Sequence, residues 1–326
     1  MEVVFPGFYD AARVGDLYLE RVGEVDSAAQ RVLDEGTILP SSQDKFRIAA
    51  FGIDVQGAFC LPGASLFVPG AVEDTRRVVE WLYRNVGQIT DLFFSLDTHH
   101  VYQVFHPAFW VDSQGKHPAP FTPVFCDDVV SGRWIPLRHR EAMIEYTRKL
   151  EATGKYVLTI WPYHALLGGA SHALVPAMME AAMFHALTRH TQTHFEIKGT
   201  HDLTENYSVM SPEVTELGGE EVGHFNLSLF EKLMSYDRLY VFGQASSHCV
   251  LSTLADLLRL GLKTDPRLLE KIYILEDGMS PVTPPPLDPL PPSLNFPAIA
   301  EQALTEFARA GMKRVKTTDL VEVPRG

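Results

Sequence analysis

Cys249 is the residue whose setting in the sequence best fits a catalytic nucleophile. It follows an apolar, β-rich run, Arg238–Gly243, and a short turn, and it precedes a helix-like stretch, Val250–Gly261. This order places the sulfur at a helix N-terminus, where free N–H groups and the helix dipole favour the thiolate. The same N–H groups could hold the oxyanion of an acyl intermediate. A buried, inert cysteine is the alternative that position alone leaves open.

Two other reactive side chains, Asp54 and Lys198, each end a β-rich run. Beside a cysteine, the aspartate could take the thiol proton and return it to a leaving amine, while the lysine stabilises the charges and helps fix the geometry. Each residue also has a structural interpretation. Asp54 could cap the following turn, and Lys198 could be a solvated side chain beside Gly199.

A possible metal site consists of Asp97, His99 and His164. Asp97 ends another β-rich run, His99 follows two residues later, and His164 ends the Trp-Pro-Tyr-His sequence after a further run. One carboxylate and two imidazoles suit Zn, Mn or Fe, with room for water or substrate. His164 could instead be hydrogen-bonded in a tight turn. Four further histidines lie close enough in sequence to replace one of these ligands: His100, His106, His117 and His172.

The elements that must position these residues alternate along the chain. Six apolar runs read as strands: Phe46–Asp54, Asp91–Asp97, Tyr156–Trp161, His194–Lys198, Arg238–Gly243 and Lys271–Glu276. Five stretches between or after them read as helices: Ala71–Asn85, His139–Thr153, His172–His190, Gly223–Met234 and Val250–Gly261. Apolar strands alternating with amphipathic helices predict a parallel sheet covered on both faces. Ligands bind at the carboxyl ends of such strands, so the reactive side chains should meet at one edge.

Three segments fall outside this alternation. Residues 1–45 form an N-terminal extension that is expected to be helical around Gly15–Leu33, and residues 46–326 form the main domain. Within that domain, about 100–137 is a long insertion rich in Pro, Phe and Trp, and about 280–297 is a proline-rich run. The two later segments are either surface loops or a lid or subunit contact.

Composition limits the classes of partner. The formal net charge of −13 disfavours nucleic acid and anionic membranes, which are bound through an excess of Lys and Arg. No apolar stretch reaches the roughly 18–20 residues that a membrane span needs, and no secretory signal is visible. The three cysteines are widely spaced and odd in number, which is not a disulfide framework. We therefore expect a protein of the reducing cytoplasm.

Taken in order, short motifs at the predicted strand ends resemble those of nicotinamidases and the wider isochorismatase-like cysteine hydrolases. The resemblance spans about residues 46–280 and depends on DVQGAFC (Asp54–Cys60), SLDTHH (Ser95–His100), WPYH (Trp161–His164), IKG (Ile197–Gly199) and GQASSHCV (Gly243–Val250). It implies an α/β protein with a six-stranded parallel sheet in three α/β/α layers. It also implies a catalytic triad of Asp54, Lys198 and Cys249.

The nicotinamidase branch of the family adds a metal, here on Asp97, His99 and His164, with Zn as the first candidate. The resemblance also implies a non-proline cis peptide bond near Gln244–Ser246 and a homo-oligomer. The sequence departs from the family pattern at three places: Gly57 and Ala58 replace an Asn-Asp pair, Ala165 replaces a frequent cysteine, and Ser246–His248 replaces Thr-Asp-Tyr. These differences leave the reaction type intact and the substrate open.

We therefore expect hydrolysis of a small carboxamide, nicotinamide first, to the carboxylate and ammonia through a thioester. Backbone N–H groups around Ala245, Ser246 and Cys249 would hold the oxyanion, and Phe59 and Trp110 are candidate ring contacts. By resemblance, the metal would bind the pyridine nitrogen or a water that orients the ring. Three alternatives remain. They are a same-fold hydrolase of ureido, maleamate-like or N-carbamoyl compounds, a catalytically silent scaffold, and a metallohydrolase in which Cys249 is incidental.

Overall fold

A six-stranded parallel sheet forms the centre of the protein. The computed structural model describes residues 5–154, 156–284 and 288–324. The strand order is β12-β11-β10-β1-β2-β7, and every neighbouring pair is parallel. The strands are β1 (Ile48–Ile53), β2 (Asp91–Asp97), β7 (His194–Lys198), β10 (Arg238–Gly243), β11 (Ile272–Leu275) and β12 (Lys313–Val315). The predicted fold class is confirmed.

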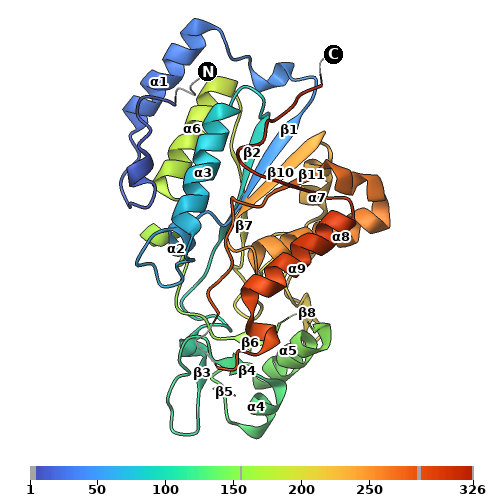
Figure 1. Ribbon diagram of the computed structural model, residues 1–326. Coiled ribbons are helices and arrows are strands. Elements are labelled where there is room, and N and C mark those ends of the chain that lie inside the picture. The colour runs from blue at the N-terminus through green and yellow to red at the C-terminus, as the bar shows by residue number, and fades with distance from the viewer. Residues whose placement is uncertain (1–4, 155, 285–287, 325–326) are drawn as a thin grey trace.

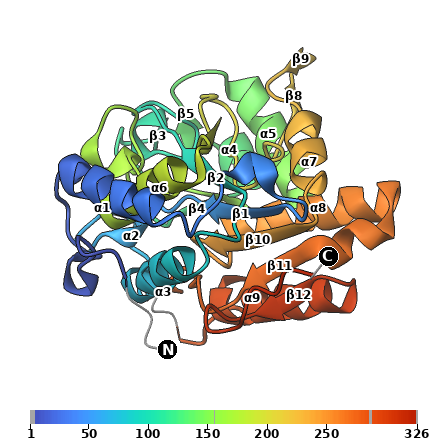
Figure 2. The ribbon, with the colours of Figure 1, turned by 90° about the horizontal axis from the view of Figure 1, so that it is seen from above.

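Helices cover both faces of this sheet. One side carries α3 (Ala71–Arg84) and α6 (Pro176–Arg189), and the other carries α7 (Leu227–Met234), α8 (Cys249–Thr264) and α9 (Phe296–Arg309), as Figures 1 and 2 show. Alternate residues of a strand face opposite sides. In β1, Ala50 therefore packs into the core under α3 and α6, whereas Phe51 packs into the core under α8.

One predicted strand is wrong in its placement. Within Tyr156–Trp161 only β6 (Leu158–Thr159) is a strand, and it pairs antiparallel with β4 (Pro123–Val124) outside the main sheet. The apolar run is buried in a different way, since Ile160 and Trp161 pack into the core of a lobe beyond the sheet. The sixth strand of the sheet is instead β12, a partly exposed segment of three residues that lacks a long apolar run.

The segment from the end of β2 onward builds that lobe at the carboxyl ends of the strands, at the bottom of Figure 1. Its elements are β3 (Trp110–Val111), β4, α4 (Cys126–Ser131), β5 (Ile135–Pro136), α5 (Arg140–Thr153) and β6, with β8 (Glu216–Leu217) and β9 (Glu220–Glu221) nearby. Short helices complete the chain: α2 (Gly57–Cys60) and the 3₁₀ turns Ala11–Arg13, Ser41–Gln43, Pro107–Phe109, Ala170–His172, Pro266–Lys271 and Pro292–Leu294. The lobe lies over the edge where the predicted site residues end their strands.

The N-terminal segment packs against the outer side of α6 through α1 (Val22–Glu35), close to the predicted helix. Arg21 and Tyr18 both donate to the carboxylate of Glu180 on α6, with Arg21 Nη2 2.7 Å from Oε2. The helix ends at Gly36, whose φ of 65° suits a residue without a Cβ. The extension is therefore tied to the domain by a buried ion pair as well as by apolar contacts.

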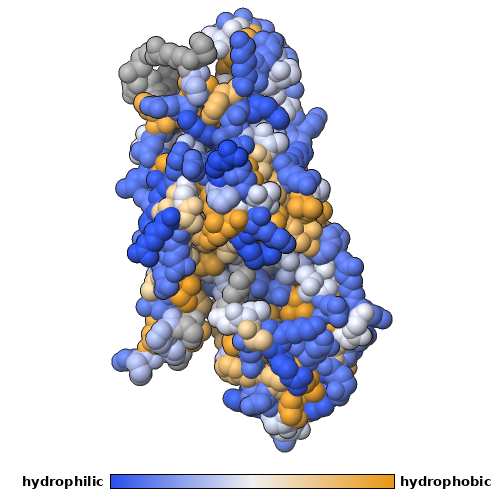
Figure 3. All heavy atoms as spheres, turned by 90° about the vertical axis from the view of Figure 1, so that its right-hand side faces the viewer, coloured by the Kyte–Doolittle hydropathy of each residue, from blue (hydrophilic) through white to orange (hydrophobic). Residues whose placement is uncertain are grey.

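The surface and the cysteines agree with the composition. Figure 3, which views the molecule from the side of α8 and α9, shows hydrophilic residues over most of this face and hydrophobic residues in small separate areas. Within the described part of the chain, no helix is long and apolar enough to span a membrane. All three cysteines are buried and unpaired, as the absence of a disulfide framework predicts. Residues 285–287 of the predicted proline-rich run lie outside the described residues.

Candidate active site

Cys249 is the first residue of α8, directly behind the turn that leaves β10. The turn contains a cis peptide bond between Gln244 and Ala245, at the place that the resemblance implies. Gly243 precedes it with a φ of 114°, and a Cβ there would lie 2.1 Å from the carbonyl oxygen of Ile53. Only glycine fits so close to the neighbouring strand, which explains why the run before Cys249 ends in this residue.

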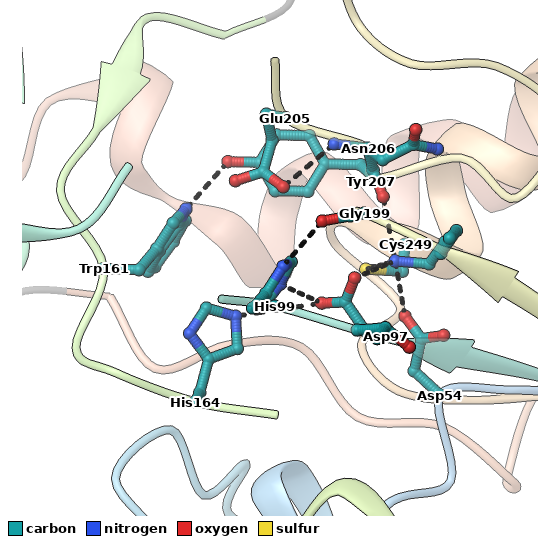
Figure 4. Close-up of polar contacts among 12 residues, drawn as sticks. Asp54, Asp97, His99, Trp161, His164, Gly199, Glu205, Asn206, Tyr207 and Cys249 are labelled. Carbon is teal, nitrogen blue, oxygen red and sulfur yellow. Dashed lines mark hydrogen bonds and ion pairs between the residues drawn. The ribbon is translucent and has the colours of Figure 1, made fainter. Parts of the chain in front are cut away.

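Lys198 joins the three predicted catalytic residues into one buried cluster. Its Nζ lies 3.0 Å from Asp54 Oδ2 and 3.7 Å from Cys249 Sγ. The same ammonium lies 2.8 Å from Asp97 Oδ1 and donates to the carbonyl oxygen of Asn206 at 2.8 Å. The structure thus brings together residues from three strand ends, as their positions in the sequence predict (Figure 4).

Asp54 is held in an unusual backbone conformation. Its φ of 47° is in the left-handed region, which a non-glycine residue occupies only at a cost. Ser95 of β2 fixes it from two sides, because its Oγ accepts from Asp54 N at 3.0 Å and donates to Oδ1 at 2.5 Å. This leaves Oδ2 for Lys198, and the carboxylate is fully buried.

The electrostatics of the cluster favour a neutral thiol beside a base. Burial raises the pKa of Cys249 well above its ordinary value, and the nearby Lys198 only partly opposes this. Burial also raises the pKa of Asp54, against the effect of the same ammonium. For Lys198, burial lowers the pKa, but Asp54 and Asp97 outweigh it and keep the amine protonated. A carboxylate with raised proton affinity beside a thiol is suited to take the thiol proton.

The three predicted metal ligands converge beside this cluster. Their ligand atoms all lie within 4.8 Å of one another, and all three residues are buried. His99 Nε2 lies 2.8 Å and His164 Nε2 3.8 Å from Asp97 Oδ2, so both rings face the same carboxylate oxygen (Figure 4). This oxygen is not the one that contacts Lys198. Asp97 therefore serves both groups of residues, with one oxygen for each.

Backbone carbonyl groups orient both imidazole rings. Nδ1 of His99 lies 3.2 Å from Gly199 O, and Nδ1 of His164 lies 2.7 Å from Pro162 O. Each Nδ1 can therefore carry the proton, leaving Nε2 as a ligand atom, which is the usual arrangement around protein-bound metals. A Cβ on Gly199 would lie 2.8 Å from Asp97 Oδ1 and from His99 Cε1, so the glycine keeps this space open. The residues present fit a divalent metal.

Asp97 is the one carboxylate of this group of three residues, and it affects the protonation of both histidines. Burial raises the pKa of Asp97, but His99 and Lys198 outweigh it and hold it below its ordinary value. Burial and the neighbouring His99 lower the pKa of His164 to about 3, so that ring is neutral at neutral pH. Burial lowers the pKa of His99, and Asp97 raises it to a greater extent.

His164 reaches the site by a route that the sequence does not predict. It is not at the end of a sheet strand, because β6 lies outside the sheet. Instead, the loop after it runs parallel to the continuation of β2. His99 N donates to Ala165 O at 3.0 Å and Leu167 N donates to His99 O at 2.9 Å. A loop that pairs like one more strand thus carries the third predicted ligand, His164.

A cavity opens beside Cys249 and the metal-ligand group. Of the two candidate ring contacts, Phe59 belongs to its lining and Trp110 does not. Trp110 is fully buried in the core, where its indole N–H donates to Val104 O at 2.6 Å. The tryptophan in the lining is Trp161, whose indole N–H donates to the hydroxyl of Tyr207 at 3.0 Å. The complete lining is Phe59, Leu66, Val68, Asp97, Trp161, His164, Glu205, Tyr207, Ala245, His248, Cys249 and Val282.

Glu205 is a cavity residue that the sequence analysis missed. It lies in the loop after β7, without the strand-end position that identified the other residues. Burial raises the pKa of Glu205 to about 7, with His99 opposing and Asp97 reinforcing the rise. Its only sequence signal is a carboxylate seven residues after Lys198, which is too weak to single it out.

The backbone N–H groups of the turn between β10 and α8 differ in whether they already have a hydrogen-bond partner. Ser246 N donates to Ser280 O at 2.9 Å, so this predicted oxyanion donor is already bonded. Within the described residues, no hydrogen bond occupies Ala245 N or Cys249 N. Ala245 and Cys249 both line the cavity. Of the two predicted turn residues, only Ala245 offers a free donor there.

Comparisons with known proteins bear on the fold. No protein-family model matches the chain, and no curated protein matches it in sequence. Many solved structures are similar, including three nicotinamidase structures. A nicotinamidase/pyrazinamidase from Acinetobacter baumanii has a TM-score of 0.53 and 21% identity, covering 86% of this chain and 100% of that one. The yeast nicotinamidase has a TM-score of 0.53 and 17% identity, covering 82% and 99%. The same yeast enzyme bound to the inhibitor nicotinaldehyde gives a TM-score of 0.53 at 16% identity, with the same coverage.

The chain has the fold of the nicotinamidases. The matches cover nearly all of those chains, so the shared part is the whole of the smaller proteins and not a fragment. At this level of identity the similarity establishes the isochorismatase-like three-layer fold and leaves the chemistry to the site itself.

Proposed function

We propose that this protein is a cysteine-dependent amidohydrolase that converts a neutral carboxamide to the carboxylate and ammonia, with nicotinamide as the first candidate. The observation that carries the proposal is the contact of Cys249 Sγ and Asp54 with one ammonium, Lys198 Nζ, beside a cavity. The fold gives separate support, because the similar structures are named nicotinamidases.

The residues provide each step of the reaction. Asp54 takes the proton of Cys249, and the sulfur attacks the carbonyl carbon to form a C–S bond. The oxyanion accepts hydrogen bonds from the N–H groups of Ala245 and Cys249. Asp54 then passes its proton to the amide nitrogen, the C–N bond breaks and ammonia leaves. A water, deprotonated by Asp54, attacks the thioester, the C–S bond breaks and Asp54 returns the proton to the sulfur. The carboxylic acid that leaves loses its proton to ammonia or solvent and becomes the carboxylate.

A divalent ion, Zn before Mn or Fe, would be held by Asp97 Oδ2, His99 Nε2 and His164 Nε2. When bound, it supplies a Lewis-acidic position for a substrate nitrogen or a water. Because Asp97 also contacts Lys198 through Oδ1, the same carboxylate links the ion's position to that of the catalytic cluster. Nδ1 of His164 contacts the backbone carbonyl of Pro162, so the loss of His164 removes a ligand without removing this link.

The cavity favours a neutral amide over an anionic one. Its described lining contains the carboxyl groups of Asp97 and Glu205 and no arginine or lysine. A maleamate-like or N-carbamoyl acid would bring a further negative charge beside these carboxyl groups, with no lysine or arginine in the described lining, so the proposed metal would be the cation left to pair with it. Apolar and aromatic side chains make up most of the remaining wall, which suits a planar, uncharged acyl group.

Ammonia release from nicotinamide tests the proposal directly. Cys249→Ala should abolish it while leaving the circular dichroism spectrum unchanged. Cys60→Ala is the matched control, since Cys60 is also buried and burial raises the pKa of its thiol to about 12. Activity that survives Cys249→Ala but not chelation would favour a metallohydrolase. The absence of ammonia release from any small amide, together with no selective labelling of Cys249 by a thiol probe, would favour a silent scaffold.

Metal analysis of the purified protein tests the ligand set. We expect about one divalent ion per chain, lost in His164→Ala. His117→Ala is the control, because that ring bonds Trp110 O in the lobe and lies outside the ligand group. Retention of a full equivalent of metal in His164→Ala would contradict the assignment. We also propose a cytoplasmic homo-oligomer, which size-exclusion chromatography with light scattering would test.

A further inference from the structure

The residue before the nucleophile, His248, occupies an aromatic enclosure beside the cavity. Its ring stacks on Tyr156 at 14° with centroids 5.6 Å apart, and it meets Trp161 edge-on at 5.5 Å. Tyr207 and Phe296 complete the enclosure at 5.5 and 4.8 Å. Burial lowers the pKa of His248 to about 4, and no charged group contributes to this shift. The ring is therefore neutral at neutral pH.

Hydrogen bonding at Ser247 indicates which ring nitrogen of His248 carries the proton. Ser247 Oγ accepts from Val282 N at 3.0 Å and lies 2.8 Å from His248 Nδ1. If the hydroxyl donates to Nδ1, both of these contacts are satisfied and the imidazole proton is on Nε2. In the other tautomer, Ser247 Oγ accepts twice, and its own hydrogen has no acceptor among the described residues. Buried polar groups are almost always satisfied, so the Nε2–H form is favoured.

This leaves an unused donor on a residue that lines the cavity. Within the described chain Nε2 has no hydrogen-bond partner, although His248 is only 5% exposed. Nε2 is not completely buried, and His248 lines the same cavity as Cys249. An N–H group with little access to water and no partner in the protein destabilises the ligand-free state. A ligand that supplies an acceptor removes this cost.

We propose that His248 is a specificity-determining residue whose Nε2–H donates to an acceptor atom on the acyl part of the substrate. The preferred class is then neutral, planar carboxamides with a ring nitrogen or oxygen in addition to the amide group. This inference rests on the proposed function, because it needs an acyl group bound at Cys249. The aromatic residues around His248 fix its ring, so the donor cannot turn away from an unsuitable substrate.

A substrate panel measures the contribution of the acceptor. We would determine kcat/KM for pyrazinamide, nicotinamide, picolinamide, isonicotinamide and benzamide in the metal-loaded wild type, His248→Phe and His248→Gln. His248→Phe keeps the aromatic packing without the donor, and His248→Gln keeps a donor. At least one acceptor-bearing amide should lose about 10- to 100-fold in His248→Phe relative to benzamide, with partial recovery in His248→Gln. Comparing each amide with benzamide in both proteins removes the contribution of the metal, which is the same in each.

Equal losses for all five amides in His248→Phe would overturn the proposal while leaving the amidohydrolase function standing. No cysteine-dependent release from any amide would remove the basis of both. A second measurement needs no active variant. Nitrogen-15 NMR of histidine-labelled wild type, assigned with His248→Gln, should show an Nε2–H tautomer for His248. An Nδ1–H tautomer would contradict the inference even if His248→Phe failed to fold.

Discussion

Two groups of buried charges in this protein resemble each other in composition and differ in the pKa of their carboxylates and in what lies beside them. One consists of Lys198 with two aspartates at the carboxyl ends of the strands. The other consists of Arg21 with Glu180, between the N-terminal segment and α6. In both, a cation meets carboxylate oxygens at hydrogen-bond distance, and the carboxylates are less than 10% exposed.

We call the second group closed, because donors from the protein occupy both oxygens of Glu180. Glu180 accepts from Tyr18 Oη at 3.0 Å and from Arg21 N, Nε and Nη2 at 2.8, 3.0 and 2.7 Å. Burial raises the pKa of Glu180, but these bonds outweigh it and lower the pKa, so the carboxylate is stable as an anion. In the first group, burial raises the pKa of Asp54, the Cys249 thiol lies next to the same ammonium, and Cys249 and Asp97 line a cavity. Burial of charge alone therefore does not mark a site; a buried carboxylate whose pKa stays raised, beside a thiol at a cavity wall, is the better indication.

The largest predicted effect is on the catalytic rate, which should depend on the carboxylate of the first group and not on that of the second. Asp54→Asn keeps the shape of the side chain and removes the base, so kcat for carboxamide hydrolysis should fall about 10²- to 10⁴-fold. Glu180→Gln, the matched carboxylate-to-amide change in the closed group, should leave kcat per folded molecule unchanged. Steady-state ammonia release, normalised to folded protein, measures both. A similar loss in the two variants would remove the distinction.

The next effect should appear in stability. Arg21→Met keeps much of the aliphatic volume and leaves Glu180 buried with only the Tyr18 hydroxyl and a backbone N–H as donors. We expect the free energy of unfolding to fall by about 2–4 kcal/mol, because one partner of a buried pair is lost. Urea titration followed by tryptophan fluorescence measures this change. Unchanged stability would show that the contact between the extension and α6 does not depend on the ion pair.

Much of the site could be predicted because strand ends of a parallel sheet meet at one edge. Asp54, Lys198 and Cys249 each follow an apolar run or belong to its end, and their pattern is local in the sequence. The position of Asp97 at the end of β2 has the same origin. For these residues, hydrophobic periodicity and topology are enough to place side chains from distant parts of the chain together.

The rest depends on packing that periodicity does not encode. The sixth strand of the sheet is Lys313–Val315 and not the predicted run Tyr156–Trp161. An apolar run can be buried in a lobe as well as in a sheet, and a short edge strand needs little apolar sequence. Trp110 and Trp161 likewise cannot be told apart by type, since both are buried. Only the path of the loop after β6 decides which of them reaches the cavity.

The smallest effect concerns the pH dependence of the closed group. The folded-state pKa of Glu180 lies below its unfolded value of about 4.3. Its stabilisation is therefore complete above the unfolded pKa and is lost as the pH falls through the folded value. Arg21→Met removes the hydrogen bonds that lower this pKa, so the stability difference from the wild type should narrow as the pH falls below about 5. Urea midpoints between pH 7 and pH 4 measure the gap. A gap that stays constant over this range would mean that Arg21 stabilises the extension through packing on its neighbours and not through the charge of Glu180.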